Sequence, residues 1–388
     1  MLPEHPEELR KFVAPEFLFG NQARRLAGRY ANNYGAVRVL LVTDPGVVAA
    51  GWPEDVSRSL EDVGVPFTIY QNVLPNPRAE QVMEGARVFH DLKCNVLLAV
   101  GGGSPIDCAK GIGIIASNGG NILDYEGVDQ VRLPCPPLIC VPTTGGTGAD
   151  VSQFCIIADK PNRRKLAILS KTLVPDVSLV DPETLVTMPP DLTAHTAFDA
   201  LTHGIEAYVS NASSPVTDLF ALEAIRLITT YLLPSMADPS NVGLRKHLML
   251  ASLNAGLAFS NASLGIVHAM AHPLDAVLDQ SHGLSNSMVL EVGITYNFEA
   301  VPDRFLAIAD AMRIPTRTTD ARYALAAILG EIERLRFAAG IKKNLTQAGI
   351  KAQDIPYLAD HALKDPCLAT NPRWPKRQEI EALYAQCF

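Results

Sequence analysis

Four residues with metal-binding side chains stand in two segments of the chain, Asp199 and His203 in FDALTHGIEAY, and His268 and His282 in GIVHAMAHPLDAVLDQSHG. Because Asp199 and His203 are four residues apart, a helix would place both side chains on one face, about 5–6 Å apart. His268 and His272 repeat this spacing on a later predicted helix. One carboxylate with several imidazoles, and no cysteine, favours a divalent cation such as Fe(II), Zn(II) or Mn(II).

A single histidine on an apolar helix is more often a hydrogen-bonded core or surface residue than a metal ligand. Two features of this region favour the metal. Three of the nine histidines fall between positions 268 and 282, and neither Lys nor Arg occurs from His247 to Ala300. Since a nearby ammonium group would repel a cation, we interpret this stretch as a candidate metal pocket.

A glycine-rich segment follows an apolar run in NVLLAVGGGSPIDCAKGIGII. The pattern predicts a strand, a loop and a helix, with Ser104 as the helix N-cap, Pro105 in the first helical position and Asp107 in the first turn. Free N–H groups at such a helix end bind phosphate well. The segment lacks the G-x-G-x-x-G fingerprint, and glycine turns are also common structural punctuation, so alone it only suggests a nucleotide.

Two further strand ends carry polar groups that suit a dinucleotide. VPTTGGTGAD offers hydroxyl and backbone donors after a predicted strand. Asp44 ends the strand in LLVTDPG. A carboxylate there would accept hydrogen bonds from a ribose diol and repel a 2′-phosphate, which favours NAD over NADP. The alternative for Asp44 is to cap the following helix.

Composition excludes several classes of protein. The 388 residues are 48% hydrophobic and carry a formal net charge of −8. We therefore expect no general affinity for nucleic acid or for anionic membranes. No run approaches eighteen apolar residues, and the start, MLPEHPEELRKF, does not resemble a signal peptide. Seven cysteines without a C-x-x-C pair fit reduced thiols, so we expect a cytoplasmic protein.

The pattern of elements changes along the chain. VRVLLV (37–42), PFTIY (66–70), NVLLAV (95–100) and LICVP (138–142) predict buried strands, with helical stretches between the first three. ADKPNRRKLAIL and VSLVDPE predict strands that come closer together, as in a small hairpin or at a sheet edge. Beyond Pro189 and Pro190 the periodicity is helical. We expect an α/β domain over residues 1–188 and an all-α domain over 189–388.

The chain resembles the iron-containing (group III) alcohol dehydrogenases from end to end. The shared motifs are LLVTDPG, PNPRAE, GGGSPIDCAKGIGI, PTTGGTGAD, SKTLVPDVSLVDPE, DALTHGIEAYVSNASSP, HAMAHPL, HGLSN and TNPR. The resemblance implies a Rossmann-like N-terminal domain with a parallel sheet, an all-α C-terminal domain and a cleft between them. This is the fold of dehydroquinate synthase and of the iron-containing alcohol dehydrogenases.

The resemblance also assigns roles by position. It implies that the metal ligands are Asp199, His203, His268 and His282, and that His272 binds substrate or transfers a proton. The implied NAD-binding residues are Asp44, Asn76, Gly101, Gly102, Gly103, Ser104, Asp107, Thr143, Thr144, Thr147 and Lys165.

Some positions depart from the family pattern. His195 stands where a small residue is usual, and we favour a packing role for it over a polar role near the metal. Asp275 replaces a common glycine, and Ser281 and Glu291 replace common prolines. Asp275 and Asp279 are expected to make the pocket more polar than usual, which bears on the substrate and not on the reaction.

The expected function is NAD-dependent oxidation of a small, uncharged primary alcohol or diol, or reduction of the aldehyde. Fe(II) is the first choice of metal, with Zn(II) or Mn(II) as alternatives, and the resemblance implies a homodimer or a higher homo-oligomer. Related enzymes of the glycerol dehydrogenase or maleylacetate reductase type remain alternatives, as does a catalytically silent metal- or nucleotide-binding protein. An anionic substrate is disfavoured, because only Arg226, Arg245 and Lys246 occur between Asp199 and Ala300.

Overall fold

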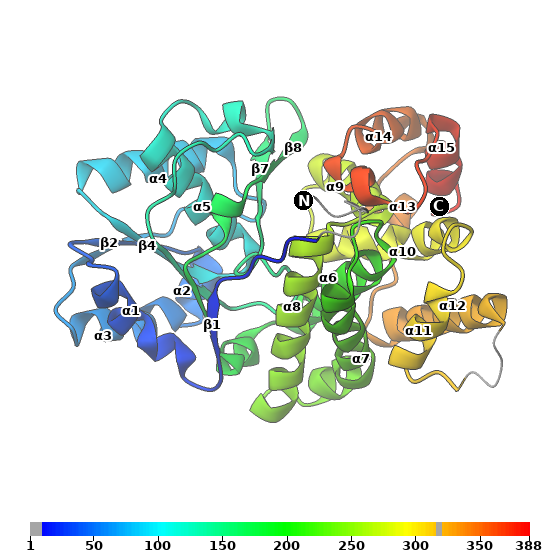
Figure 1. Cartoon of the computed structure of the whole chain (residues 1–388), viewed down its shortest axis with the longest axis horizontal. Coiled ribbons are helices and arrows are strands. Elements are labelled where there is room, and N and C mark those ends of the chain that lie inside the picture. The colour runs from blue at the N-terminus through cyan, green and yellow to red at the C-terminus, as the bar shows by residue number, and fades with distance from the viewer. Residues whose placement is uncertain (1–9, 316–319) are drawn as a thin grey trace, which may run out of the picture.

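The computed structural model describes residues 10–315 and 320–388, which form an α/β half and a helical half side by side (Figure 1). The expectation for the start of the chain falls mostly on residues 1–9, outside the described residues. The strands are β1 (Glu16–Phe19), β2 (Val39–Val42), β3 (Phe67–Tyr70), β4 (Val96–Gly101), β5 (Gly127–Val128), β6 (Leu138–Pro142), β7 (Phe154–Asp159), β8 (Arg164–Leu169) and β9 (Val177–Val180).

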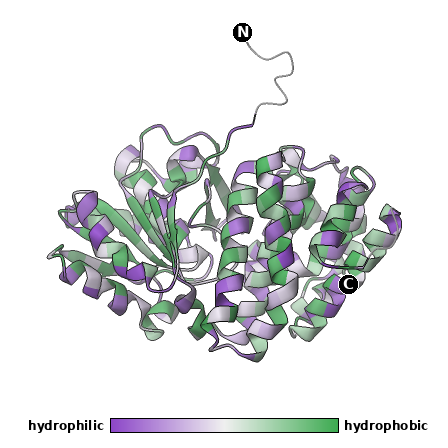
Figure 2. Cartoon of the chain, turned by 60° about the horizontal axis from the view of Figure 1, so that its bottom comes forward, coloured by the Kyte–Doolittle hydropathy of each residue, from purple (hydrophilic) through white to green (hydrophobic). Residues whose placement is uncertain are grey.

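Six strands form a parallel sheet in the order β1-β9-β6-β4-β2-β3. Strands β2, β4 and β6 are runs of buried Val, Leu, Ile, Ala and Cys, as expected for strands covered on both faces. The four predicted strands are present as β2, β3, β4 and β6, but β3 is not buried as predicted. It lies at the edge of the sheet, and of its four residues only Tyr70 is buried. Figure 2 shows these hydrophobic strands between helices of mixed polarity.

Helices cover both faces of this sheet. The helices of this half are α1 (Ala27–Asn33), α2 (Pro45–Ala49), α3 (Trp52–Glu61), α4 (Ala79–Asp91) and α5 (Gly103–Asn118). Alternate strand residues separate the two cores: Leu40 and Leu97 pack with α4 and α5, while Leu41 and Leu98 pack with α1 and α3. The alternation follows from the period of two along a strand.

The predicted hairpin is present, with β7 antiparallel to β8 and β5 alongside, in a second, three-stranded sheet. VSLVDPE is not at a sheet edge, because β9 lies between β1 and β6 in the main sheet. The edge strand β1, EFLF, was not predicted, since four half-exposed residues carry little periodic signal.

The second half is helical, as predicted: residues 189–315 and 320–388 contain no strand. Its helices are α6 (Pro190–Val209), α7 (Pro215–Ala237), α8 (Val242–Ala262), α9 (Ile266–Leu278), α10 (His282–Phe298), α11 (Arg304–Ala311), α12 (Ala321–Ala338), α13 (Leu345–Ala348), α14 (Ile355–Ala362) and α15 (Arg377–Ala385). Pro189 and Pro190 mark the change, since Pro190 is the first residue of α6, where a missing N–H costs nothing.

The carboxyl ends of β2, β4 and β6 lie at one edge of the sheet. From β2 the chain adds β3 on one side and then returns to add β4 on the other side, so the strand order reverses between β2 and β4. Ligands of doubly wound sheets bind at such switch points. Among the described residues no single helix is long and apolar enough to cross a membrane. Helices α8 and α9 reach that length and hydropathy only together, and they are bent by 105° to each other.

Candidate active site

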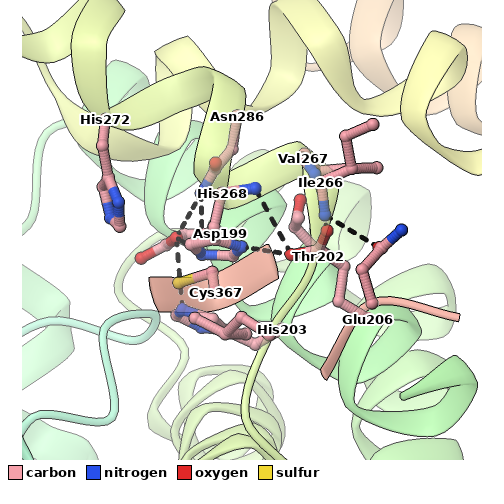
Figure 3. Close-up of polar contacts among 12 residues, drawn as sticks. Asp199, Thr202, His203, Glu206, Ile266, Val267, His268, His272, Asn286 and Cys367 are labelled. Carbon is pink, nitrogen blue, oxygen red and sulfur yellow. Dashed lines mark hydrogen bonds and ion pairs between the residues drawn. The ribbon is translucent and has the colours of Figure 1, made fainter. Parts of the chain in front are cut away.

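Helix α6 presents Asp199 and His203 on one face, as the four-residue spacing predicts. Both side chains are buried, and His203 Nε2 lies 3.7 Å from Asp199 Oδ1. His268 lies on α9 and His282 is the first residue of α10; their Nε2 atoms are 3.8 and 3.6 Å from the same oxygen. The four predicted ligands, from three helices, therefore converge on one point, and Figure 3 shows three of them facing one another.

A glycine allows α10 to approach α6 closely enough for this convergence. A Cβ atom on Gly283 would lie 1.8 Å from the His195 carbonyl oxygen and 3.2 Å from Asp199 Cβ. Only a residue without a side chain can therefore follow His282. His195 itself is half-buried, contributes its backbone to this contact and does not line the cavity described below, in agreement with the packing role favoured from the sequence.

Each of the three imidazoles has its Nδ1 atom held by an acceptor. His268 Nδ1 is 2.5 Å from Glu206 Oε2, His282 Nδ1 is 2.6 Å from Asp275 Oδ2, and His203 Nδ1 is 3.3 Å from the Gly146 carbonyl oxygen. An Nδ1–H that donates to these acceptors leaves the Nε2 lone pair free. The rings are thus oriented as metal-binding histidines are oriented by their outer partners.

Charge and hydrogen bonding at the centre favour a cation. Burial lowers the pKa of His203 to about 3. Against the effect of burial, the Asp199 and Glu206 carboxylates raise the pKa of His268 to about 9, so positive charge is stabilised between them. Asn286 Nδ2 donates to Asp199 Oδ1 at 2.8 Å and is 3.2 and 3.3 Å from the Nε2 atoms of His268 and His282. The two N–H groups of one amide cannot satisfy all three acceptor atoms. This nitrogen and oxygen donor set suits Fe(II), Zn(II) or Mn(II).

A second cluster, His272, Asp365 and Cys367, also has the composition of a metal site. Its groups already satisfy one another. His272 Nδ1 is 2.6 Å from Asp365 Oδ2, and Asp365 Oδ1 accepts from the Cys367 backbone N–H at 2.9 Å. Burial raises the pKa of the Cys367 thiol well above its usual value, so no thiolate is offered. This cluster therefore orients His272 and does not need a cation.

The glycine loop after β4 and the threonine loop after β6 pack against each other. A Cβ atom on Gly102 would meet Thr144 Cγ2 at 2.8 Å, and one on Gly103 would meet Thr147 Cγ2 at 3.0 Å. The N-cap of α5 is Gly102, so the prediction that Ser104 caps this helix is wrong. Gly102 can take the cap position, two residues earlier, because it has no Cβ to meet Thr144. Pro105 and Asp107 are therefore the third and fifth helical residues, and not the first and third as predicted. Ser104 Oγ instead accepts from the Asn76 backbone N–H at 3.2 Å.

Both loops and the histidine cluster line one cavity of about 880 Å³. The predicted cofactor residues that line it are Asp44, Asn76, Gly102, Gly103, Ser104, Asp107, Thr143, Thr144, Thr147 and Lys165; the histidine cluster contributes Asp199, His203, His268, His272 and His282. Gly101 is the exception: it does not line the cavity but lies beneath the Pro105 ring, which a Cβ there would approach to 2.4 Å.

Asp44 fills both roles considered from the sequence, since it lines the cavity and is the N-cap of α2. Its Oδ1 accepts from the Val47 backbone N–H at 2.9 Å. Burial raises the pKa of Asp44. A capping carboxylate keeps its other oxygen available, so capping does not prevent a contact with a ribose.

The two unusual acids on α9 have different surroundings. Asp279 lines the cavity, forms an ion pair with Lys160 Nζ at 2.7 Å and accepts a hydrogen bond from Asn76 Nδ2 at 3.1 Å. These contacts link the helical half to the α/β half. Asp275 is wholly buried, lies outside the cavity lining and pairs with Lys165 Nζ at 2.9 Å. The expectation that Asp275 makes the pocket more polar is therefore wrong, because its carboxylate pairs with Lys165 and does not line the cavity.

Sequence reasoning missed Glu206, Asn286, Asp365 and Cys367. Two of them carried a helical signal: Glu206 is seven residues after Asp199, and Asn286 is four after His282, so each lies on the face of a predicted ligand. Asp365 and Cys367 carried none. They come from the N-cap and first turn of a short 3-10 helix, Pro366–Thr370, some ninety residues beyond the histidine they contact.

Comparisons with known proteins agree with this arrangement. Residues 14–182 match the family model described as iron-containing alcohol dehydrogenase, and residues 193–388 match that of the Fe-containing alcohol dehydrogenase family, C-terminal. The chain is 39% identical over 372 residues to 1,3-propanediol dehydrogenase of Klebsiella pneumoniae, which covers 95% of this chain and 96% of that protein.

Two further proteins give the same result. The chain is 35% identical over 369 residues to NAD-dependent methanol dehydrogenase of Bacillus methanolicus, covering 95% and 97% of the two chains. The crystal structure of 1,3-propanediol oxidoreductase superposes with a TM-score of 0.95 at 38% identity, covering 98% of this chain and all of that one. The chain belongs to the family of iron-containing alcohol dehydrogenases.

Proposed function

We propose that this protein is a metal-dependent, NAD-linked alcohol dehydrogenase that interconverts a small, uncharged primary alcohol or diol and its aldehyde. The observation that carries the proposal is a single cavity lined by both predicted nucleotide loops and by the cluster of Asp199 with three inward-facing imidazoles. The named activities of similar proteins, on propanediol and on methanol with NAD, support it.

Asp199, His203, His268 and His282 would hold the divalent cation, with Fe(II) as the first choice and Zn(II) or Mn(II) as alternatives. The two loops, with Asp44, Asn76 and Lys165, would hold NAD. When bound, the cation supplies Lewis acidity at the alcohol oxygen and the nicotinamide supplies a hydride acceptor.

The chain's own residues account for the proton and for the exclusion of water. His272 Nδ1 is held by Asp365, so Nε2 is the nitrogen available to take the hydroxyl proton on oxidation and to return it on reduction. Phe154, Ile156, Leu192, Phe259 and Leu264 give the cavity an apolar lining that suits a short carbon chain and keeps bulk water from the reacting carbon.

Other properties complete the proposal. We propose that residues 1–188 and 189–388 are the two domains, and that the active protein is a cytoplasmic homodimer or a higher homo-oligomer. No nucleic acid or membrane partner is part of it, in keeping with the net charge of −8.

The test is NADH formation, followed by absorbance, with a panel of small primary alcohols and diols. Protein stripped of metal is compared with protein reloaded anaerobically with Fe(II), with Zn(II) and with Mn(II). Turnover that returns with a metal and is absent from the stripped sample supports the proposal. Binding of metal and NADH, without turnover of any alcohol or matching aldehyde in either direction, would support the silent binding protein instead.

A further inference from the structure

Among the described residues, Lys165 is the only Lys or Arg that lines the cavity. It lies on β8, its side chain is 8% exposed, and its ammonium group is 2.9 Å from Asp275 Oδ2 on α9. The side chain of Asp275 is fully buried. The charge of this ammonium group is therefore neutralised by a carboxylate that does not line the cavity.

The same carboxylate oxygen, Asp275 Oδ2, is 2.6 Å from His282 Nδ1. Asp275 thus accepts from Lys165 of the α/β half and from a predicted metal ligand of the helical half. A buried carboxylate held by two such donors is fixed in place, because loss of either contact would leave charge uncompensated away from water. The Lys165 ammonium is held with it.

Among the described lining residues, Lys165 is the only Lys or Arg side chain that a substrate carboxylate can pair with. Asp44 and Asp107 also line the cavity and repel a carboxylate, and helices α9 and α10 contain neither Lys nor Arg. While Lys165 is paired with Asp275, no other Lys or Arg side chain among the described lining residues compensates a negative charge brought in by a substrate.

We infer that Asp275 is a specificity-determining residue, which pairs with Lys165 and thereby makes the cavity select uncharged aldehydes over carboxylate-bearing ones of similar length. This inference rests on the proposed dehydrogenase function and specifies its substrate class. Loss of the Asp275 charge frees the Lys165 ammonium to form a charge-assisted hydrogen bond with a substrate carboxylate.

The experiment compares pentanal with 4-oxobutanoate as substrates of the metal-loaded enzyme with NADH. The variants are Asp275→Asn, Asp275→Ala and the double variant Asp275→Asn with Lys165→Met. Asp218→Asn, which leaves Arg304 without its partner at 2.6 Å far from the cavity, is the matched control. The measured quantity is the ratio of the two kcat/KM values within each variant, so that a lower metal content, determined separately, cancels.

The expected result is a shift of this ratio toward 4-oxobutanoate by about tenfold in both single Asp275 variants, the effect of one charge-assisted hydrogen bond. The shift is absent in the double variant and in the control. Affinity of the enzyme–NADH complex for butanoate, measured by NADH fluorescence, rises in parallel and does not depend on turnover. An unchanged ratio and unchanged butanoate affinity in active Asp275 variants would overturn the inference. A wild-type enzyme that reduces neither aldehyde, nor any other in the panel, would instead contradict the proposed function.

Discussion

At the scale of single residues, the acceptors at the Nδ1 atoms of the histidines determine how the site is arranged. Glu206, Asp275 and the Gly146 carbonyl each accept at an Nδ1 atom, and this leaves the three Nε2 atoms facing Asp199. Glu206 also accepts from the Val267 backbone N–H at 2.6 Å and so binds the first turn of α9. One carboxylate therefore sets both the helix and the orientation of the ring that the helix carries.

The substitution Glu206→Gln tests whether Glu206 orients the His268 ring. Glutamine can still accept from the backbone of α9, but it does not offer a carboxylate to His268 Nδ1. We expect the fold to persist and metal affinity to fall by about 10- to 100-fold, as for other outer partners of metal-binding histidines. Competition with a chelator of known affinity measures the change, with circular dichroism as the control. Unaltered affinity would show that Glu206 only caps the helix.

Asp365 is expected to act through His272. In Asp365→Asn the His272 ring loses its carboxylate partner and its fixed tautomer, so kcat should fall by at least about tenfold while metal content stays at the wild-type level. The pH profile of kcat should shift as well, since the charge next to the ring is removed.

His272→Ala should likewise retain its metal, whereas His268→Ala should lose metal and activity together. Metal lost from the Asp365 or His272 variant would instead assign that cluster to the cation.

At the scale of helices and strands, close contacts determine whether the ligands meet. The helices that carry Asp199, His203, His268 and His282 follow from their periodicity and spacing, and the buried strands β2, β4 and β6 follow from apolar runs. The contact of α10 with α6 through Gly283 does not, because it depends on two segments more than eighty residues apart.

Gly283→Ala tests this contact. The added methyl group would lie 1.8 Å from the His195 carbonyl oxygen, so α10 must move away from α6 and take His282 with it. We expect a loss of about 1–3 kcal/mol in the free energy of unfolding, with weaker metal binding. Gly330→Ala on α12 is the matched control, since a Cβ there meets nothing within 4 Å and should stabilise the protein by about 0.5–1 kcal/mol. Equal behaviour of the two variants would refute the role of this contact.

Sequence alone predicted the two halves, the four residues that meet at Asp199 and the two loops that line the cavity, because each depends on local spacing or on a contiguous motif. Prediction from the sequence failed where contacts between distant segments determine the structure. The cap of α5 is Gly102 because the threonine loop leaves room only for glycine there. The pairing of Asp275 with Lys165 joins residues 110 positions apart, and Asp365 reaches His272 from a short 3-10 helix. None of these contacts leaves a periodic signal in the sequence.

At the scale of the whole molecule, the two kinds of site belong to different halves. Gly102, Gly103 and the threonine loop come from the α/β half, and the four predicted metal ligands come from α6, α9 and α10. Lys165 with Asp275 and Lys160 with Asp279 join the halves across the cavity. Binding of metal should therefore stabilise mainly the helical half.

Metal removal tests this division of roles. Stripped protein should unfold at a lower temperature, because a ligand that binds only the folded state stabilises it by mass action. It should still bind NADH, because the glycine and threonine loops belong to the α/β half. We expect a Kd within about threefold of the loaded protein, which is less than the 1.4 kcal/mol of a tenfold change. Calorimetry and NADH fluorescence measure the two effects. Loss of NADH binding together with the metal would mean that the glycine loop depends on the helical half.

The most direct test of the account is anomalous X-ray scattering at the absorption edge of the metal reloaded into the protein. We expect one strong peak, about 2.0–2.2 Å from Asp199 and from the Nε2 atoms of His203, His268 and His282. A peak at His272, Asp365 and Cys367, or no ordered metal in protein that turns over an alcohol, would contradict it.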